Sequence, residues 1–280
     1  MMELLKGAPV AEALTLRAKE AADALKEKGI IPCLAVVRVG AREDDLSYER
    51  GIAKRFEKAG CAVRNVVLDE NVSQAELEKT FAAQNDDPAV HGILLFRPLP
   101  KHLDAAPLIA SIKPQKDVDC MGPANAAKIY AGDRSGFAPC TALAVVRILE
   151  HYGINMVGAN ATVIGRSAVI GKPVAMLLLA NNATVTVCHT KTKNLPEICR
   201  NADILVAAAG VAKMVGEEYL SENQVLLDVG IHMTEEGLCG DVDPAAAQKA
   251  AFCTPVPGGV GAVTTSVLLQ QTVTAAQMCL

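Results

Sequence analysis

The stretch Thr162-Val-Ile-Gly-Arg-Ser-Ala-Val-Ile-Gly-Lys-Pro173 decides the fold of this 280-residue chain. A short β-branched run (161–164) ends in Gly165, and six residues later Gly171 opens a segment of helix-forming composition. A strand, a glycine turn and a helix together let backbone N–H groups and a helix N-terminus converge on a phosphate. The spacing G-x-x-x-x-x-G departs from the common G-x-G-x-x-G fingerprint. The stretch therefore predicts either a nucleotide site or an ordinary strand-to-helix turn.

The composition extends an α/β prediction to the whole chain. Apolar residues make up 51% of it and aromatic residues only 3%, so the cores must consist of Ala, Val, Leu and Ile. Such cores favour parallel strands covered by helices on both faces, and the length suggests two domains. The net charge of −4, with Lys and Arg interspersed, argues against a nucleic-acid surface.

The start of the chain and its cysteines suggest a cytoplasmic protein. Residues 1–7 carry two charges and no long apolar run, so we expect neither a signal peptide nor a membrane span. The nine cysteines include no C-x-x-C pair. This pattern predicts buried thiols in a reducing compartment and no metal site.

Alternating helical and strand segments predict two α/β domains, which can bind a ligand in a cleft between them. In the first domain (1–120) we expect helices at 9–28, 44–59 and 73–83 and strands at 32–39, 61–68 and 90–96. Ser73 and Glu76 form a capping box for the third helix. In the second, Rossmann-type domain (121–263) we expect strands near 161–164, 183–188, 203–208 and 225–229. A connecting helix (141–151) precedes them, and the last helix (264–280) is expected to pack back on the first domain.

Two loops of the second domain carry candidate ligand contacts. The run His189-Thr-Lys-Thr-Lys193 stands where an NAD-binding domain has an acidic residue for the ribose hydroxyls. Its hydroxyls and lysines suit a 2′-phosphate, or they form a solvated basic loop. Thr254-Pro-Val-Pro-Gly-Gly-Val-Gly261 combines stiffening prolines with glycines that let a ligand approach the backbone. A plain surface loop is the alternative there.

The first domain contributes two further candidates. Lys116-Asp-Val-Asp119 carries carboxylates two residues apart. They form either a solvated turn or an acceptor for an amino-substituted heterocycle in the cleft. Tyr48 shares a helix face with Ile52, so it is either a core side chain or a cleft side chain.

Several short motifs, taken in order, resemble the methylenetetrahydrofolate dehydrogenase/cyclohydrolase family over essentially the whole chain. They are Lys116-Asp-Val-Asp119, Pro139-Cys-Thr141, Ile164-Gly-Arg-Ser167, Gly171-Lys-Pro173, Thr184-Val-Thr-Val-Cys-His189, Asp228-Val-Gly-Ile231, Gly240-Asp-Val242 and the 254–261 loop. Each motif alone is weak, whereas the ordered set is specific.

The resemblance implies a cytoplasmic homodimer that binds folate in the cleft and NADP on the Rossmann domain. The positions that match the family's dinucleotide contacts are Gly165, Arg166, Ser167, Thr190 and Ile231. The positions that match its folate-facing residues are Tyr48, Asp119, Pro257, Gly258 and Gly259. Of these, Tyr48 and Asp119 are the expected catalytic positions. The family usually has a serine where this chain has Thr190.

The chain departs from the family at two positions of the expected cleft. The family's active-site lysine lies four residues after the tyrosine, where this chain has Ile52, and Phe96 replaces the family's glutamine. Lys54 lies about 120° around the helix from Tyr48 and is a poor substitute.

The resemblance therefore predicts oxidation of 5,10-methylenetetrahydrofolate with NADP, with cyclohydrolase activity weak or lost. Two alternatives stay open at this point. One is a fully bifunctional enzyme in which Lys54 or Arg97 reaches the site by another route, and the other is a folate- or nucleotide-binding paralogue without catalysis.

Overall fold

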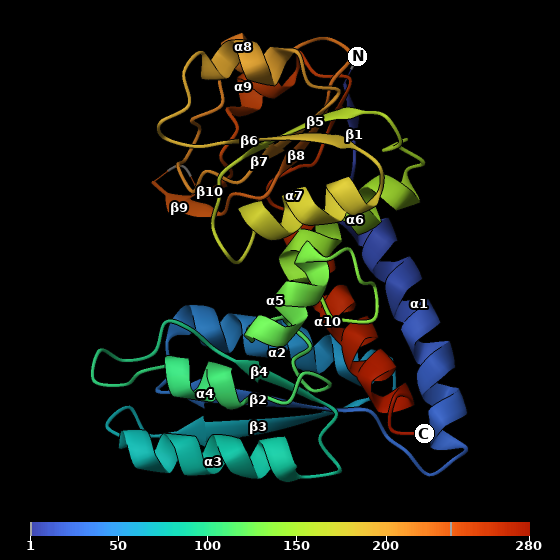
Figure 1. Cartoon of the computed structure of the whole chain (residues 1–280), viewed down its shortest axis with the longest axis vertical. Helices are drawn as coiled ribbons and strands as arrows, with labels where there is room; N and C mark the ends of the chain where they lie inside the picture. The colour runs from blue at the N-terminus through green and yellow to red at the C-terminus, as the bar shows by residue number, and fades with distance from the viewer. Residues whose placement is uncertain (1, 236) are drawn as a thin grey trace. The chain divides into compact units, whose positions relative to one another are not determined.

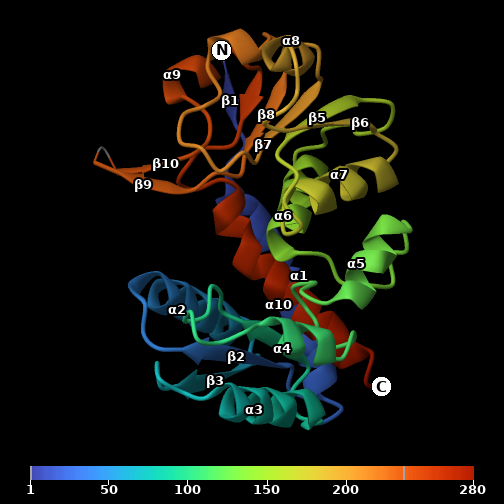
Figure 2. The same ribbon diagram turned by 60° about the vertical axis from the view of Figure 1, so that its left-hand side comes forward.

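Two compact units make up the structure, a computed structural model that describes residues 2–235 and 237–280 (Figures 1 and 2). Unit 1 contains the chain up to Ala11 together with residues 141–264, and unit 2 contains residues 12–140 and 265–280. The sequence analysis placed the boundary at residue 120, whereas unit 2 extends to Cys140. Unit 1 also takes in the first residues of the chain.

Unit 2 is built on a three-stranded parallel sheet in the order β3-β2-β4. All residues of the central strand are buried because helices cover both faces of the sheet. Figure 1 shows α2 and α3 on opposite faces. The strands are β2 (Cys33–Val39), β3 (Ala62–Leu68) and β4 (Gly92–Leu95). The helices are α2 (Glu43–Lys58), α3 (Gln74–Asp86), α4 (Ala106–Ser111), α5 (Pro123–Tyr130) and most of α1 (Gly7–Lys26) and α10 (Val260–Gln277).

Local sequence signals of unit 2 are visible in the structure. Ser73 Oγ accepts a hydrogen bond from Glu76 N at 3.2 Å, which confirms the expected N-terminal cap of α3. Behind this cap, Leu77 and Phe81 pack with Val37 and Leu108 in one apolar core. Burial of this apolar stripe, rather than helix propensity, fixes α3 on the sheet.

Unit 1 is a doubly wound domain with a six-stranded parallel sheet in the order β1-β11-β8-β7-β5-β6. The chain adds β6 on one side of β5 and β7 on the other, so the strand order reverses at β5. In such sheets ligands bind outside the carboxyl ends of the strands at this switch point. The strands are β1 (Glu3–Leu4), β5 (Asn160–Ile164), β6 (Thr184–Cys188), β7 (Ile204–Ala207), β8 (Val225–Asp228) and β11 (Phe252–Cys253). The two-domain α/β fold with a Rossmann-type second part is thus confirmed.

The remaining elements of unit 1 are helices and one hairpin. The helices are α6 (Cys140–His151), α7 (Gly171–Ala180), α8 (Leu195–Arg200), the 3-10 turn η1 (Glu217–Tyr219) and α9 (Pro244–Ala247). The antiparallel hairpin consists of β9 (His232–Thr234) and β10 (Gly237–Cys239). The hairpin and the two-residue strands β1 and β11 escaped the sequence analysis because such short segments show no periodicity. Among the described residues, no helix is long and apolar enough to cross a membrane.

Candidate functional site

The glycine turn after β5 is built as the sequence indicated. Gly165 has φ +120°, and a Cβ there would collide with the carbonyl oxygen of Ala208. A Cβ at Gly171 would collide in turn with the carbonyl of Gly165. Ser167 Oγ accepts hydrogen bonds from Ile170 N (3.1 Å) and Gly171 N (3.3 Å), which closes the turn onto α7. The missing side chains bring the helix start and two strand ends into direct contact.

The basic loop after β6 lies beside this turn. Gly165 N donates to Cys188 O at 2.9 Å, so the residues that follow β5 and β6 start from adjacent strand ends. His189 N donates to Thr192 Oγ1 (2.8 Å), and this bond folds 189–192 into a tight turn. The side chains of Arg166 and Thr190 are exposed on these two neighbouring turns. The structure therefore presents a cation and a hydroxyl at one edge of the sheet, as an anion site requires.

The Pro-Gly loop and Ile231 line one pocket of unit 1. Its volume is about 270 Å³, and its walls are residues 228–231, Leu238 and residues 255–262. Gly258 has φ +99° and accepts a hydrogen bond from Gly7 N (2.8 Å), while Ile231 is 61% exposed. The structure thus brings Ile231 together with Pro257, Gly258 and Gly259, whose shared location the sequence did not show.

In unit 2, Tyr48 and Asp119 lie in one environment. Burial raises the pKa of the Tyr48 phenol well above its usual value, and Cys140 and Asp119 raise it further. Burial also raises the pKa of Asp119, while hydrogen bonds from Cys140 and the charge of Arg97 oppose that rise. Cys140 N donates to Asp119 Oδ1 at 2.9 Å and fixes the carboxyl group. Tyr48 therefore stays a neutral phenol, able to donate or accept a hydrogen bond.

The two carboxylates of the 116–119 motif have different roles in the structure. Asp117 is 1% exposed and accepts from Met121 N (2.7 Å), Gly122 N (2.9 Å) and Asn125 Nδ2 (3.2 Å). These bonds close the loop that leads into α5. Asp119 is only partly buried. The sequence alone did not distinguish the two carboxylates. In the structure Asp117 holds the loop, so Asp119 is the candidate for binding a ligand.

Apolar side chains occupy the two positions where the chain departs from the family pattern. Ile52 is fully buried, and the ring of Phe96 packs on that of Tyr48 with centroids 5.7 Å apart. Lys54 and Arg97 are exposed. Lys54 lies on a different face of α2 from buried Ile52, as the helical spacing predicts.

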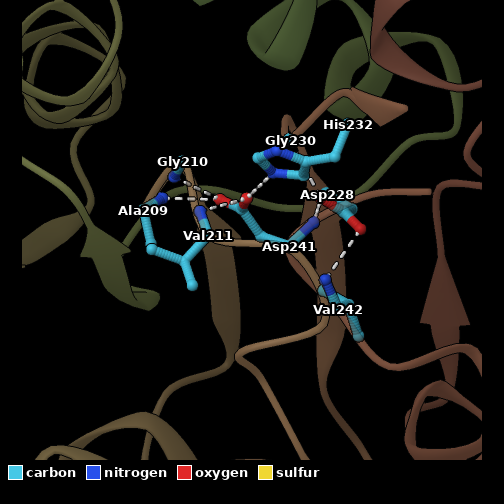
Figure 3. A network of polar contacts seen from close by, with 8 residues as sticks. All are labelled: Ala209, Gly210, Val211, Asp228, Gly230, His232, Asp241 and Val242. Carbon is cyan, nitrogen blue, oxygen red and sulfur yellow. Dashed lines mark hydrogen bonds and ion pairs between the residues drawn. The ribbon is translucent and has the colours of Figure 1, made fainter. Parts of the chain in front are cut away.

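Sequence reasoning missed a polar network at the strand ends of unit 1 (Figure 3). Asp241 is fully buried and accepts from Ala209 N (2.6 Å), Gly210 N (3.0 Å), Val211 N (3.1 Å) and the His232 ring (Nε2 to Oδ1, 2.7 Å). Asp228 accepts from Gly230 N, Asp241 N and Val242 N at 2.9–3.0 Å. Both acids stand in motifs noted above, but sequence alone gives no sign that a carboxylate fills a backbone turn.

The donor set fits a dinucleotide and offers no metal site. The exposed Arg166, Thr190 and the N-terminus of α7 suit phosphate groups, and the pocket beside Ile231 is mainly apolar. The structure, over the residues it describes, contains no group of three or more His, Cys, Asp and Glu side chains able to hold a metal ion. All nine cysteines have free thiols.

Comparison with known proteins covers both units. One family model, tetrahydrofolate dehydrogenase/cyclohydrolase, catalytic domain, matches residues 5–119. The corresponding NAD(P)-binding domain model matches residues 139–280. A curated relative, the bifunctional protein FolD of Clostridioides difficile (strain 630), is 50% identical over 278 residues, which is 99% of this chain and 97% of that protein.

Solved structures agree with this match. The bifunctional FolD enzyme of Campylobacter jejuni has a TM-score of 0.96 and 40% identity, with 100% of both chains covered. The Trypanosoma brucei methylenetetrahydrofolate dehydrogenase-cyclohydrolase, solved with NADP cofactor and inhibitor, has a TM-score of 0.92 and 36% identity over 99% of this chain and 98% of that one. The chain therefore belongs to the tetrahydrofolate dehydrogenase/cyclohydrolase family, with a catalytic domain followed by an NAD(P)-binding domain.

Proposed function

We propose that the protein oxidises 5,10-methylenetetrahydrofolate to 5,10-methenyltetrahydrofolate with NADP, and that its cyclohydrolase activity is weak or lost. The observation that carries the loss of hydrolysis is the apolar character of two positions: the Phe96 ring packs on the Tyr48 ring, and Ile52, one helical turn after Tyr48, is fully buried. Family membership and the phosphate-type turn at Gly165 support the oxidation with NADP.

The oxidation breaks one C–H bond of the methylene carbon, and the hydrogen leaves with both electrons. The two flanking nitrogens stabilise the resulting cation, so no protein base is needed. Bound NADP supplies the hydride acceptor. The protein's task is to bind and orient both molecules, because positioning alone can supply much of the rate.

The residues of this chain divide that task between them. The Asp119 carboxylate, held by Cys140 N, accepts hydrogen bonds from the amino-substituted pterin ring. The neutral phenol of Tyr48 lies beside the reacting carbon. Pro257, Gly258 and Gly259 offer bare backbone to flat rings. Gly165, Ser167 and Ile231 contact the dinucleotide, and Arg166 and Thr190 bind its 2′-phosphate.

Hydrolysis of the methenyl cation makes different demands. A water must be positioned and deprotonated, and a proton must reach the departing nitrogen. In the family this work falls to the lysine and glutamine whose places Ile52 and Phe96 take. Neither side chain has a titratable or hydrogen-bonding atom, and the hydride step needs no water.

Two assays on one preparation test the proposal. Appearance of NADPH with 5,10-methylenetetrahydrofolate measures the oxidation, and loss of methenyltetrahydrofolate, corrected for the uncatalysed rate, measures hydrolysis. Lack of turnover with either nicotinamide cofactor, together with tight folate binding, would identify a non-catalytic paralogue instead. Robust hydrolysis would identify a bifunctional enzyme, the function that the names of the FolD relatives favour.

We also propose that the protein is a cytoplasmic homodimer. The free thiols suit a reducing compartment. The β9–β10 hairpin exposes Met233 (80%) and part of Leu238, apolar surface that a second copy of the chain can cover. Sedimentation of the purified protein measures the oligomeric state.

A further inference from the structure

The turn after β7 is held by a protein carboxylate rather than left open for a ligand. The N–H groups of Ala209, Gly210 and Val211 converge on Asp241, whose two oxygens lie 2.6–3.1 Å from the three nitrogens. Such a concave run of N–H groups is an anion site. Because Asp241 fills it, the turn binds no phosphate, and its position depends on that carboxylate.

This turn lies at the switch point of the sheet. β7 is the neighbour of β5 on the side where the strand order reverses. The carbonyl of Ala208, the residue before the turn, faces Gly165 so closely that no Cβ fits between them. Any shift of residues 208–211 therefore reaches the glycine turn directly.

His232 connects the same carboxylate to the other cofactor segment. Its ring Nε2 lies 2.7 Å from Asp241 Oδ1, the oxygen that also accepts from Val211 N. His232 directly follows Ile231, which lines the pocket with the Pro-Gly loop. One carboxylate oxygen thus joins the turn after β7 to His232 (Figure 3), and His232 is the neighbour of Ile231 in the chain.

The network leaves little freedom around this oxygen. A Cβ at Gly230 would collide with Asp241, and one at Gly240 would collide with Asp228. The side chain of Asp241 is fully buried, whereas that of His232 is 22% exposed. Among the described donors to Asp241, three are backbone N–H groups and the fourth is the His232 ring, which a substitution can remove without altering a backbone bond.

We propose that His232 is a positioning residue for NADP: its hydrogen bond to Asp241 holds the 209–211 turn and the Ile231 segment at a fixed separation, so that the dinucleotide crevice is formed before binding. The inference rests on the proposed assignment of Gly165 and Ile231 to the cofactor. Preorganisation of this kind increases affinity because binding no longer has to order the loops.

Calorimetric titration of the full chain with NADP tests this positioning role. The variants His232→Leu and His232→Ala remove the ring N–H that donates to Asp241. His232→Gln serves as the rescue variant, because the glutamine amide nitrogen can take the place of the ring Nε2. We expect the Kd for NADP to rise about tenfold in the first two variants, a change of about 1.4 kcal/mol. The Kd for NADP of His232→Gln and of the exposed control His151→Leu should stay within about twofold of wild type. The kcat at saturating NADP and the KM for folate should change little in all four.

The failures of the two proposals are distinguishable. Absence of NADP binding by the wild-type protein contradicts the proposed function. If Arg166→Ala weakens NADP binding while the His232→Leu and His232→Ala variants bind like wild type, only the positioning role is wrong. It is also wrong if His232→Gln loses as much affinity as His232→Leu while both melt at the wild-type temperature.

Discussion

The aromatic rings of Tyr48 and Phe96 pack against each other with centroids 5.7 Å apart and planes inclined by 31°. Ile52, one helical turn after Tyr48 on α2, is fully buried. The phenol is therefore flanked by an aromatic ring instead of an amide or an ammonium group. We expect such surroundings to disfavour a bound water, whereas the hydride step of the proposed function needs none.

Restoring the polar pair should restore hydrolysis. We expect Ile52→Lys combined with Phe96→Gln to raise enzyme-dependent loss of methenyltetrahydrofolate at neutral pH about tenfold or more, because general acid–base catalysis typically contributes ~10²–10⁴-fold. The apolar control Ile52→Met with Phe96→Leu should leave the rate unchanged. Thermal unfolding must accompany the assay, since a lysine at this buried position costs stability. Wild-type hydrolysis well above the uncatalysed rate would contradict the prediction.

NADP should be preferred over NAD because of Arg166 and Thr190. Charge-assisted hydrogen bonds to the 2′-phosphate are worth roughly 1.5–3 kcal/mol each. We therefore expect Arg166→Ala to reduce the ratio of kcat/KM for NADP to that for NAD by about tenfold or more. Thr190→Asp should reduce it further, since a carboxylate repels the phosphate and accepts from ribose hydroxyls. Arg17→Ala, which removes an exposed arginine of α1, is the matched control. Equal or better use of NAD by the wild-type enzyme would show that the preference is wrong.

Asp117 and Asp119 should respond differently to the same substitution. Asp117→Asn leaves loop N–H groups without a full set of acceptors and should lower the free energy of unfolding by about 1–3 kcal/mol. Asp119→Asn should change stability less and instead raise the KM for folate and lower kcat/KM. Chemical denaturation and steady-state kinetics on both variants measure this. The assignment fails if Asp117→Asn is the variant that loses folate binding with its stability intact.

The free energy of unfolding should depend on pH because of Asp228. Burial raises its pKa from 3.8 to about 6, so the folded state keeps a proton that the unfolded chain releases. The corresponding stabilisation is fully present below pH 3.8 and is lost as the pH rises through about 6. Relative to Asp228→Asn, which does not titrate, the free energy of unfolding of the wild type should fall by up to about 3 kcal/mol across this window. Above pH 7 the difference should be constant. A difference that does not vary with pH would contradict the raised pKa.

The sequence predicted those parts of the fold that local patterns determine. An apolar run marked β2, a short β-branched run marked β5, and Ser73 marked the start of α3. The pairing of β1 with β11 was not predictable, because each strand has two residues and their partners lie about 250 positions apart. Their order depends on packing of the whole sheet, which no local pattern encodes.

The candidate site was predictable in kind rather than in arrangement. Gly165 predicted the tight turn after β5, and the lysines of residues 189–193 predicted a basic loop after β6. The different roles of Asp117 and Asp119 depend on which backbone N–H groups face them, a tertiary property. The same applies to His232, whose proposed role depends on its hydrogen bond to Asp241, nine residues later in the chain.

The two ends of the chain complete the two units, and this constrains the order in which they form during translation. Glu3 and Leu4 pair with Phe252 and Cys253, so the first strand of unit 1 has no partner until the ribosome has passed residue 253. Gln271 on α10 donates to Val118 O (2.7 Å) and Ala138 O (2.9 Å), so unit 2 also awaits a late segment. A nascent chain therefore carries an unfinished sheet in unit 1 and unfinished packing in unit 2 at once, and residues 252–271 contribute to completing both.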